Sequence, residues 1–408
     1  MPEQPKWRFE KLIKPMFDIP TSQVVLKGRV LTGVGDEVIE DGFVHIDGAE
    51  IGAVGQASDL GDTGAEAVDT RGTIIPGLWN NHAHMGWDGV HDLAAQSIYD
   101  SREIVAYKYC GNMLKALRAG LTTCRDLGVH DTNLITKQAV EQGIFPGPRL
   151  LVTGAPIVQT AGHTFWVCLE ASGADDMRRA VREQVRGGAD LIKIMGCHDT
   201  LEFTDEELAA VIDESHRMGV PITAHATYDA CISRCVSFGV DVIEHGGDMS
   251  DETIQMLVDR DIPIVSTFSP MAMQANAEHA RKFNIPEWKI EERQRALESG
   301  ARFEGLVKAA EAGVPIIFGT DAGSPAVPID AVVPEMDLMV KLGVVKDNYG
   351  AIRSATSVSA KANKMDDKLG TLEAGKLADV VVIHGNPLED LHALTNVEMT
   401  FLEGKRMV

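Results

Sequence analysis

Several features that would place this 408-residue chain in other classes of protein are missing from it. It has no apolar run of 18 residues, so no segment is expected to span a membrane as a helix. The first 20 residues carry four prolines and several charges where a signal peptide would need an apolar stretch. We therefore expect a cytoplasmic protein with no membrane partner.

Basic charge and paired cysteines are also scarce. The chain has 38 Lys and Arg against 60 Asp and Glu, and a net charge of −22 argues against nucleic acid or an anionic membrane as partner. The six cysteines form no C-x-x-C pair, which predicts reduced thiols rather than disulfides. Cys231 and Cys235 are four residues apart on a predicted helix, where core packing is favoured over metal binding.

The central part of the chain alternates between short apolar runs and amphipathic stretches. The amphipathic stretches, such as residues 176–188, have apolar residues at helical spacing and end in glycine. Strict alternation of eight strand–helix units predicts an α/β fold, a (β/α)8 TIM barrel over residues 73–369. The predicted strands are 73–78, 122–128, 149–154, 191–195, 221–226, 241–246, 263–268 and 315–323.

The flanking segments differ in texture from the centre. Residues 21–72 and 370–408 contain short β-type runs separated by Gly and Asp, such as GFVHIDG and ADVVVIHGN. They predict a small β-sandwich built from both chain ends. Prolines prevent a long helix in residues 1–20, which are expected to form an extended arm on the body or on a second subunit.

Six polar residues lie at or just beyond the ends of predicted strands, where the chemistry of such barrels collects. On a strand, residues i and i+2 point to the same side, so the H-x-H pair can meet one ion. Four histidines, a carboxylate and a lysine together predict a site for divalent metal. The six are His82, His84, Lys193, His225, His245 and Asp321.

Lys193 is the unusual member of this set because it interrupts the apolar run LIKIM. An unpaired ammonium in the barrel mouth would be costly. One interpretation is a salt bridge. The other is a lysine carbamylated by CO₂, whose anionic carbamate can bridge two cations. The resulting nitrogen and oxygen ligands suit Zn²⁺ best and leave Mn²⁺, Co²⁺ and Fe²⁺ open.

Several motifs together resemble the amidohydrolase superfamily over almost the whole chain. They are PGLWNNHAH, GGADLIKI, AHA, IEHG, GTDAG and GTLEAGKLADVVV. The resemblance is to the branch with two metal ions and a bridging, carbamylated lysine. It implies one ion on His82 and His84 with Asp321, the other on His225 and His245, and Lys193 between them. It also implies that a metal-bridged hydroxide attacks a carbonyl while Asp321 takes its proton and passes it to the leaving amine.

TTCRDLG and GGADLIKI are similar to motifs of the imidazolonepropionase-related branch, which includes prolidase-like enzymes. In that branch a histidine after strand 3 contacts the substrate carbonyl and a tyrosine after strand 5 holds a carboxylate. The matching positions are His163 in QTAGHT and Tyr228 in HATY. Both motifs depart from the pattern: Ala161 replaces a glycine, and the tyrosine follows the strand-5 histidine by three residues instead of two. His198 is expected to be exposed.

The leading hypothesis is hydrolysis of an amide beside a carboxylate, in a small molecule such as a dipeptide or an N-acyl amino acid. The rival is opening or deamination of a cyclic amidine. Relatives with that chemistry usually use one metal, lack the strand-4 lysine and have a glutamate where Tyr228 stands. A lactonase or ester hydrolase also stays open, as does a homo-oligomer. A non-catalytic scaffold is disfavoured because all six predicted ligands are present.

Overall fold

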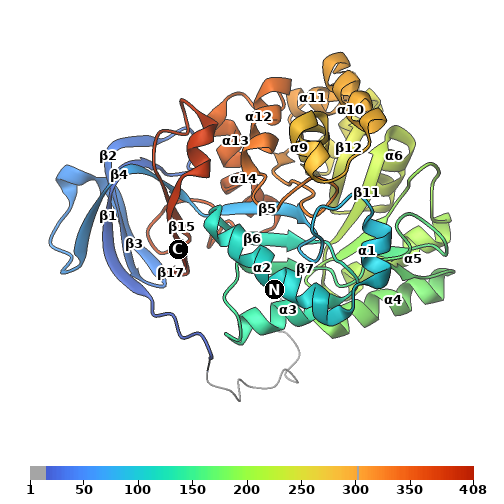
Figure 1. Cartoon of the computed structure of the whole chain (residues 1–408), viewed down its shortest axis with the longest axis horizontal. Coiled ribbons are helices and arrows are strands. Elements are labelled where there is room, and N and C mark those ends of the chain that lie inside the picture. The colour runs from blue at the N-terminus through green and yellow to red at the C-terminus, as the bar shows by residue number, and fades with distance from the viewer. Residues whose placement is uncertain (1–14, 301–302) are drawn as a thin grey trace.

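The computed structural model describes residues 15–300 and 303–408 of the chain, so residues 1–14 of the predicted arm lie outside the described part. A β-sheet forms one end of the long axis, and a larger body of parallel strands and covering helices forms the rest (Figure 1). Within the described residues, no helix combines the length and the apolar character needed to cross a membrane.

The sheet at the end of the molecule joins the two ends of the chain. Its order is β17-β16-β15-β4-β1-β2-β3, and β4 pairs antiparallel with β15, where Val380 lies opposite Pro76. Buried side chains from both ends, among them Leu26 and Phe401, share one hydrophobic cluster. The chain ends therefore pair, but in one continuous seven-stranded sheet where a sandwich of two sheets was predicted. The strands are β1 (Ser22–Leu31), β2 (Val38–Gly48), β3 (Glu50–Gln56), β4 (Glu66–Pro76), β15 (Val380–Ile383), β16 (Val397–Leu402) and β17 (Lys405–Arg406).

The body contains two parallel sheets, ordered β5-β6-β7 and β14-β13-β12-β11-β10-β8-β9. Backbone hydrogen bonds join them at two places: Asn81 N donates to Phe318 O (3.0 Å), and Asp190 N donates to Val152 O (2.8 Å). This α/β arrangement is consistent with the predicted barrel. The strands are β5 (Leu78–Ala83), β6 (Leu121–Asp126), β7 (Arg149–Val152), β8 (Ile157–Val158), β9 (Leu169–Glu170), β10 (Ile192–Met195), β11 (Ile222–Tyr228), β12 (Val242–Asp248), β13 (Ile264–Val265) and β14 (Ile316–Ile317).

The first predicted strand of the body, residues 73–78, is wrong as a single element. β4 carries the chain through Pro76 in the end sheet, and β5 begins at Leu78 in the body. Gly77 separates them, and a Cβ there would lie only 2.1 Å from Thr122 Oγ1. Only glycine fits this close approach, so the chain passes from one sheet to the other at that residue.

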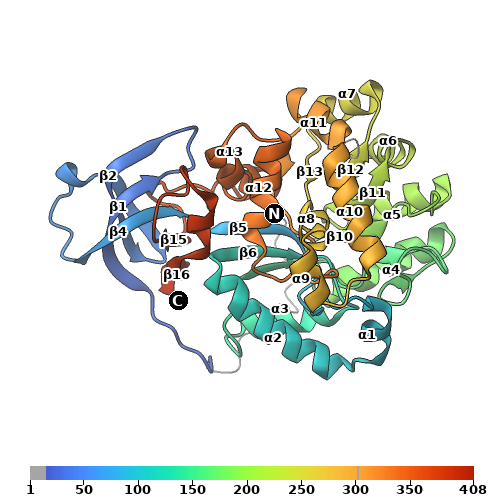
Figure 2. The ribbon, with the colours of Figure 1, turned by 45° about the horizontal axis from the view of Figure 1, so that its top comes forward.

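Helices cover the outer side of the parallel strands (Figure 2). The predicted strict alternation is wrong in several places: α1 and α2 both follow β5, no helix lies between β7 and β8, and α8 to α11 follow β13 before β14. All six cysteines are free, and Cys231 and Cys235 are buried in the core, as predicted. The helices are α1 (Leu93–Tyr99), α2 (Arg102–Arg118), α3 (Thr132–Glu141), α4 (Ala174–Gly187), α5 (Asp205–Arg217), α6 (Asp229–Phe238), α7 (Asp251–Asp259), α8 (Ser269–Ala275), α9 (Ala277–Lys282), α10 (Glu287–Ser299), α11 (Glu304–Glu311), α12 (Val332–Leu342), α13 (Asn348–Ser354) and α14 (Ser357–Ala362).

A buried carboxylate ties α4 to α5 and allows a stability prediction. The side chain of Glu214 is 1% exposed, and it accepts hydrogen bonds from Arg217, Arg182 (2.6 Å) and Arg178 (3.2 Å). Arg217 and then Arg182 lower the pKa of Glu214 from 4.5 to about 2. We expect Glu214→Gln to lower the free energy of unfolding at pH 7 by about 1–3 kcal/mol, because bonds to charged groups are lost.

The pH dependence of this effect has a defined sign. Because the folded-state pKa of Glu214 is depressed, its contribution is complete above about pH 4.5 and is lost as the pH falls toward 2. Denaturant melts at pH 7 and pH 3 should therefore show a larger difference between wild type and Glu214→Gln at pH 7. Asp213→Asn is the matched control, since its side chain is 61% exposed and it pairs with Arg178 on the surface. Equal effects of the two substitutions would contradict the prediction.

Candidate metal centre

The H-x-H pair projects from the end of β5 toward Asp321, which follows β14. His82 is 1% exposed and His84 is 6% exposed. The Nε2 atoms of His82 and His84 lie 3.4 and 3.5 Å from Asp321 Oδ1. One ligand atom from each of the three residues lies within 4.8 Å of the others. The structure thus brings these three predicted ligands together at a spacing that one metal ion could fill.

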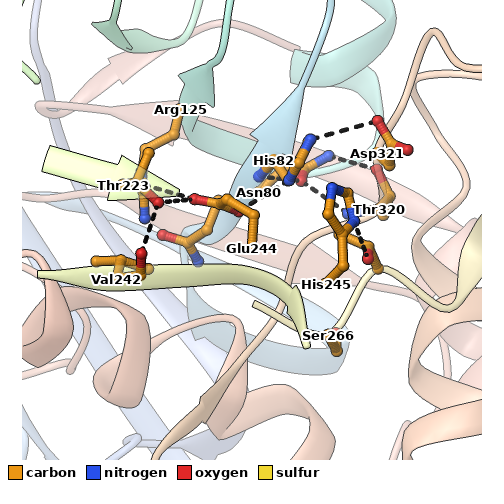
Figure 3. A network of polar contacts seen from close by, with 12 residues as sticks. Asn80, His82, Arg125, Thr223, Val242, Glu244, His245, Ser266, Thr320 and Asp321 are labelled. Atoms are coloured by element: carbon orange, nitrogen blue, oxygen red, sulfur yellow. Dashed lines mark hydrogen bonds and ion pairs between the residues drawn. The ribbon is translucent and has the colours of Figure 1, made fainter. Parts of the chain in front are cut away.

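The other nitrogen of each of these two imidazoles is already engaged. His82 Nδ1 lies 2.8 Å from Glu244 Oε2, and His84 Nδ1 lies 2.7 Å from the carbonyl oxygen of Gly128. A carboxylate or a carbonyl at Nδ1 fixes the ring orientation and leaves Nε2 as the free acceptor. Both Nε2 atoms therefore face Asp321 Oδ1. Figure 3 shows this contact for His82.

His225 on β11 and His245 on β12 stand beside this group. The ring centroid of His245 lies 4.8 Å from that of His82 and 4.5 Å from that of His225. His245 has a φ of 73°, a left-handed conformation in the middle of β12. Its Nδ1 is 2.8 Å from Thr267 Oγ1. Two further imidazoles are thus available next to the His82, His84 and Asp321 group.

Lys193 lies on β10 and is 1% exposed. Within residues 15–300 and 303–408, its ammonium forms no hydrogen bond or ion pair with another residue. Burial lowers its pKa, while the charges of Glu244 and Asp321 act in the opposite direction. The salt-bridge interpretation of Lys193 is therefore not seen in the structure. A buried lysine without a partner is rare. Burial favours the neutral amine, which is the form of lysine that can react with CO₂.

The electrostatics of the site suit a metal. Burial is the main cause that lowers the pKa of all four predicted histidine ligands, and it brings that of His84 to about 4. They are thus neutral at physiological pH and keep the lone pair that a metal requires. Burial also raises the pKa of Asp321 to about 7. Neutral imidazoles with one carboxylate are a donor set that fits Zn²⁺ and similar ions.

His163 is brought to the rim of this group. Its ring stacks on that of His198 at 4.2 Å and 15°, and it lies 4.7 Å from the ring of His225. Its backbone N donates to Glu202 Oε1 (2.6 Å), which holds the loop. Ala161 in this loop adopts a φ of 60°. The backbone therefore keeps the left-handed conformation that a glycine would accept more easily. The side chain of His198 is 59% exposed, as predicted.

Tyr228 is the last residue of β11 and is partly buried. Desolvation raises its pKa to about 12, and the neighbouring Cys197 thiol contributes to the shift. The structure thus places the Tyr228 hydroxyl near Cys197.

Two charged residues of the site were not among the residues predicted from the sequence. Glu244 precedes His245 in β12 and is 0% exposed, and Arg125 in β6 is 1% exposed. Arg125 Nη2 and Glu244 Oε1 form an ion pair of 3.0 Å (Figure 3). Both residues interrupt buried strands, as Lys193 does. The argument applied to Lys193 would therefore have identified them.

Comparison with known proteins identifies the family. The model of the amidohydrolase family matches residues 73–407. The ochratoxinase of Aspergillus niger is 25% identical over 418 aligned positions, which cover 90% of this chain and 82% of that protein. The structure superimposes on a Xaa-Pro dipeptidase with methionine in its active site with a TM-score of 0.83, at 28% identity and over 94% of this chain and 99% of that one. A prolidase in complex with N-methylphosphonate-L-proline gives a TM-score of 0.81, at 27% identity and over the same shares. The chain therefore belongs to the amidohydrolase family and is a hydrolytic enzyme of that family.

Proposed function

We propose that this enzyme hydrolyses the amide bond of a dipeptide or an N-acyl amino acid at a centre that holds two divalent ions. The observation that carries the proposal is the group of His82, His84 and Asp321, beside which Lys193 is buried without a partner. The names of the similar proteins, a Xaa-Pro dipeptidase and a prolidase, support a peptide-like substrate. We also infer that the parallel strands close into a (β/α)8 barrel with the site at their carboxyl ends.

The residues that would hold the ions divide into two sets. His82, His84 and Asp321 would bind one ion, and His225 and His245 the other, with Lys193 as a carbamate between them. Zn²⁺ is favoured because imidazole nitrogens predominate among the ligands. When bound, such a pair of ions would lower the pKa of a water between them and polarise the substrate carbonyl.

Side chains of the protein would carry out the proton transfer and bind the substrate. Asp321 Oδ1 faces the two imidazoles, so its second oxygen, Oδ2, would accept the proton of the attacking water and deliver it to the leaving nitrogen. His163 lies beside His225 at the rim, where an imidazole N–H could donate to the substrate carbonyl. Tyr228, at the end of β11, would bind the carboxylate of the product amino acid.

A substrate screen tests this proposal. The zinc-loaded enzyme is incubated with Xaa-Pro, Xaa-Arg/Lys and N-acyl amino acid libraries, with cyclic amidines and with lactones, and the products are identified by mass spectrometry. We expect equal amounts of free amino acid and of its acyl partner, and loss of turnover after a chelator removes the metal. Ammonia released from amidines without amide cleavage would overturn the proposal in favour of deamination. Lactone opening alone would favour an ester hydrolase.

A further inference from the structure

Three side chains surround the buried carboxylate of Glu244, and together they suggest a function for it. Oε1 accepts from Arg125 Nη2 (3.0 Å) and from the hydroxyl of Thr223, while Oε2 faces His82 Nδ1 at 2.8 Å. These residues come from β6, β11, β12 and β5, and Figure 3 shows them as one chain of contacts that continues from His82 to Asp321. The network thus links a buried ion pair to a predicted metal ligand.

We propose that Arg125 and Glu244 are positioning residues that fix the proton of His82 on Nδ1 and thereby set the affinity of His82, His84 and Asp321 for a divalent ion. This inference rests on the metal centre of the proposed function. A guanidinium has only donors, and Thr223 also donates its hydroxyl proton, so the Glu244 oxygens act as acceptors. Oε2 then requires a donor at His82 Nδ1, which leaves the Nε2 lone pair directed toward Asp321.

The environment of Arg125 supports a specific function for its charge. The side chain is 1% exposed, and within the described residues its Nε and Nη1 atoms are buried without a hydrogen-bond partner. Such unsatisfied donors cost free energy that an apolar side chain of similar size would not. A purely structural role would thus be served better by an apolar residue. What the guanidinium supplies at this position, and an apolar side chain cannot, is a charged donor that stabilises the Glu244 carboxylate as an acceptor beside His82.

An isosteric substitution separates this role from packing. In Glu244→Gln the amide oxygen can still accept from Arg125 and Thr223, but an NH₂ group then faces His82 Nδ1. The proton of His82 would move to Nε2, where it blocks the metal. Arg125→Met removes the charge, and Arg125→Lys keeps it. Glu214→Gln is the control, since Glu214 is a buried glutamate that accepts from Arg182 and Arg217 between α4 and α5.

Two measurements on the full chain test the inference without using activity. Co²⁺-loaded proteins are titrated with a competing chelator and followed by the visible absorption of Co²⁺. We expect about 10- to 100-fold weaker Co²⁺ binding in Glu244→Gln and Arg125→Met, and only a few-fold weaker binding in Arg125→Lys. Glu214→Gln should lower the melting temperature and leave the Co²⁺ affinity unchanged. In ¹⁵N-histidine-labelled protein, the two-bond ¹H–¹⁵N correlations should show that the His82 ring changes tautomer in Glu244→Gln.

The outcomes distinguish this inference from the proposed function. Unchanged Co²⁺ affinity in folded Glu244→Gln, with Co²⁺ bound by the wild type, would overturn the inference alone. A wild-type chain that retains no Co²⁺ would overturn the metal centre and the inference with it. Should Glu244→Gln fail to fold, Thr223→Val removes one donor to Glu244 Oε1 and should still weaken Co²⁺ binding. If Thr223→Val and Arg125→Met each keep the full Co²⁺ affinity, the positioning role is rejected.

Discussion

Replacing Asp321 with Asn should lower kcat about 10²- to 10⁴-fold on the substrate found by the screen. The amide keeps the size of the side chain and an oxygen that can face His82 and His84, as Oδ1 does. It cannot accept a proton from water and return it to the leaving nitrogen. Because substrate binding does not require this transfer, KM should change little while kcat falls. The melting temperature should stay within a few degrees of the wild type.

Kinetics and metal analysis together decide the role of Asp321. Asp330→Asn is the matched control, since Asp330 lies in the same segment after β14 and is exposed. That variant should keep wild-type kcat and metal content. Turnover of Asp321→Asn within a few-fold of the wild type, with metal bound, would remove Asp321 as the proton carrier. Loss of metal in Asp321→Asn would instead show that the carboxylate acts chiefly as a ligand.

The grouping of His82, His84 and Asp321 could be predicted from the sequence because it depends on strand direction. Parallel strands carry their carboxyl ends to one side, so polar residues at those ends meet even when they are far apart in the chain. Runs such as LIKIM and DVIEHG mark such strands without reference to any partner. The same reasoning places His225 and His245 next to the group.

Features that depend on long-range contacts or on backbone conformation could not be predicted in this way. The last two strands of the body, β13 and β14, end earlier than predicted, at Val265 and Ile317. Thr267 and Asp321 follow them with φ values of 49° and 53°. No pattern of apolar residues reports a left-handed φ at a non-glycine position. The division at Gly77 likewise depends on Thr122, which comes from another strand. The pairing of β4 with β15, which places Val380 opposite Pro76, likewise joins segments far apart in the chain.

Lys193→Ala is expected to abolish binding of at least one metal ion and to reduce activity by several orders of magnitude. Under the proposed function, the substitution removes the group that would bridge the two ions, and stabilisation by two metals would contribute several kcal/mol to the transition state. It also leaves a buried space the size of a lysine side chain. Acetate or propionate could enter this space and replace the carbamate, so added acid should restore part of the activity and of the metal content.

A second buried lysine makes this rescue specific. Lys137 is 7% exposed, but unlike Lys193 it has a carboxylate partner, Asp190, and lies away from the predicted ligands. Lys137→Ala should lower the free energy of unfolding, because Asp190 is left without its cation, and keep full activity and metal content with or without acetate. Chloride at the same ionic strength should rescue neither variant. Full activity of Lys193→Ala without added acid would reject the carbamate, and equal stimulation of both variants by acetate would show a general effect of the salt. Rescue confined to Lys193→Ala would mean that the site requires an anion at this position, which a protonated lysine cannot supply.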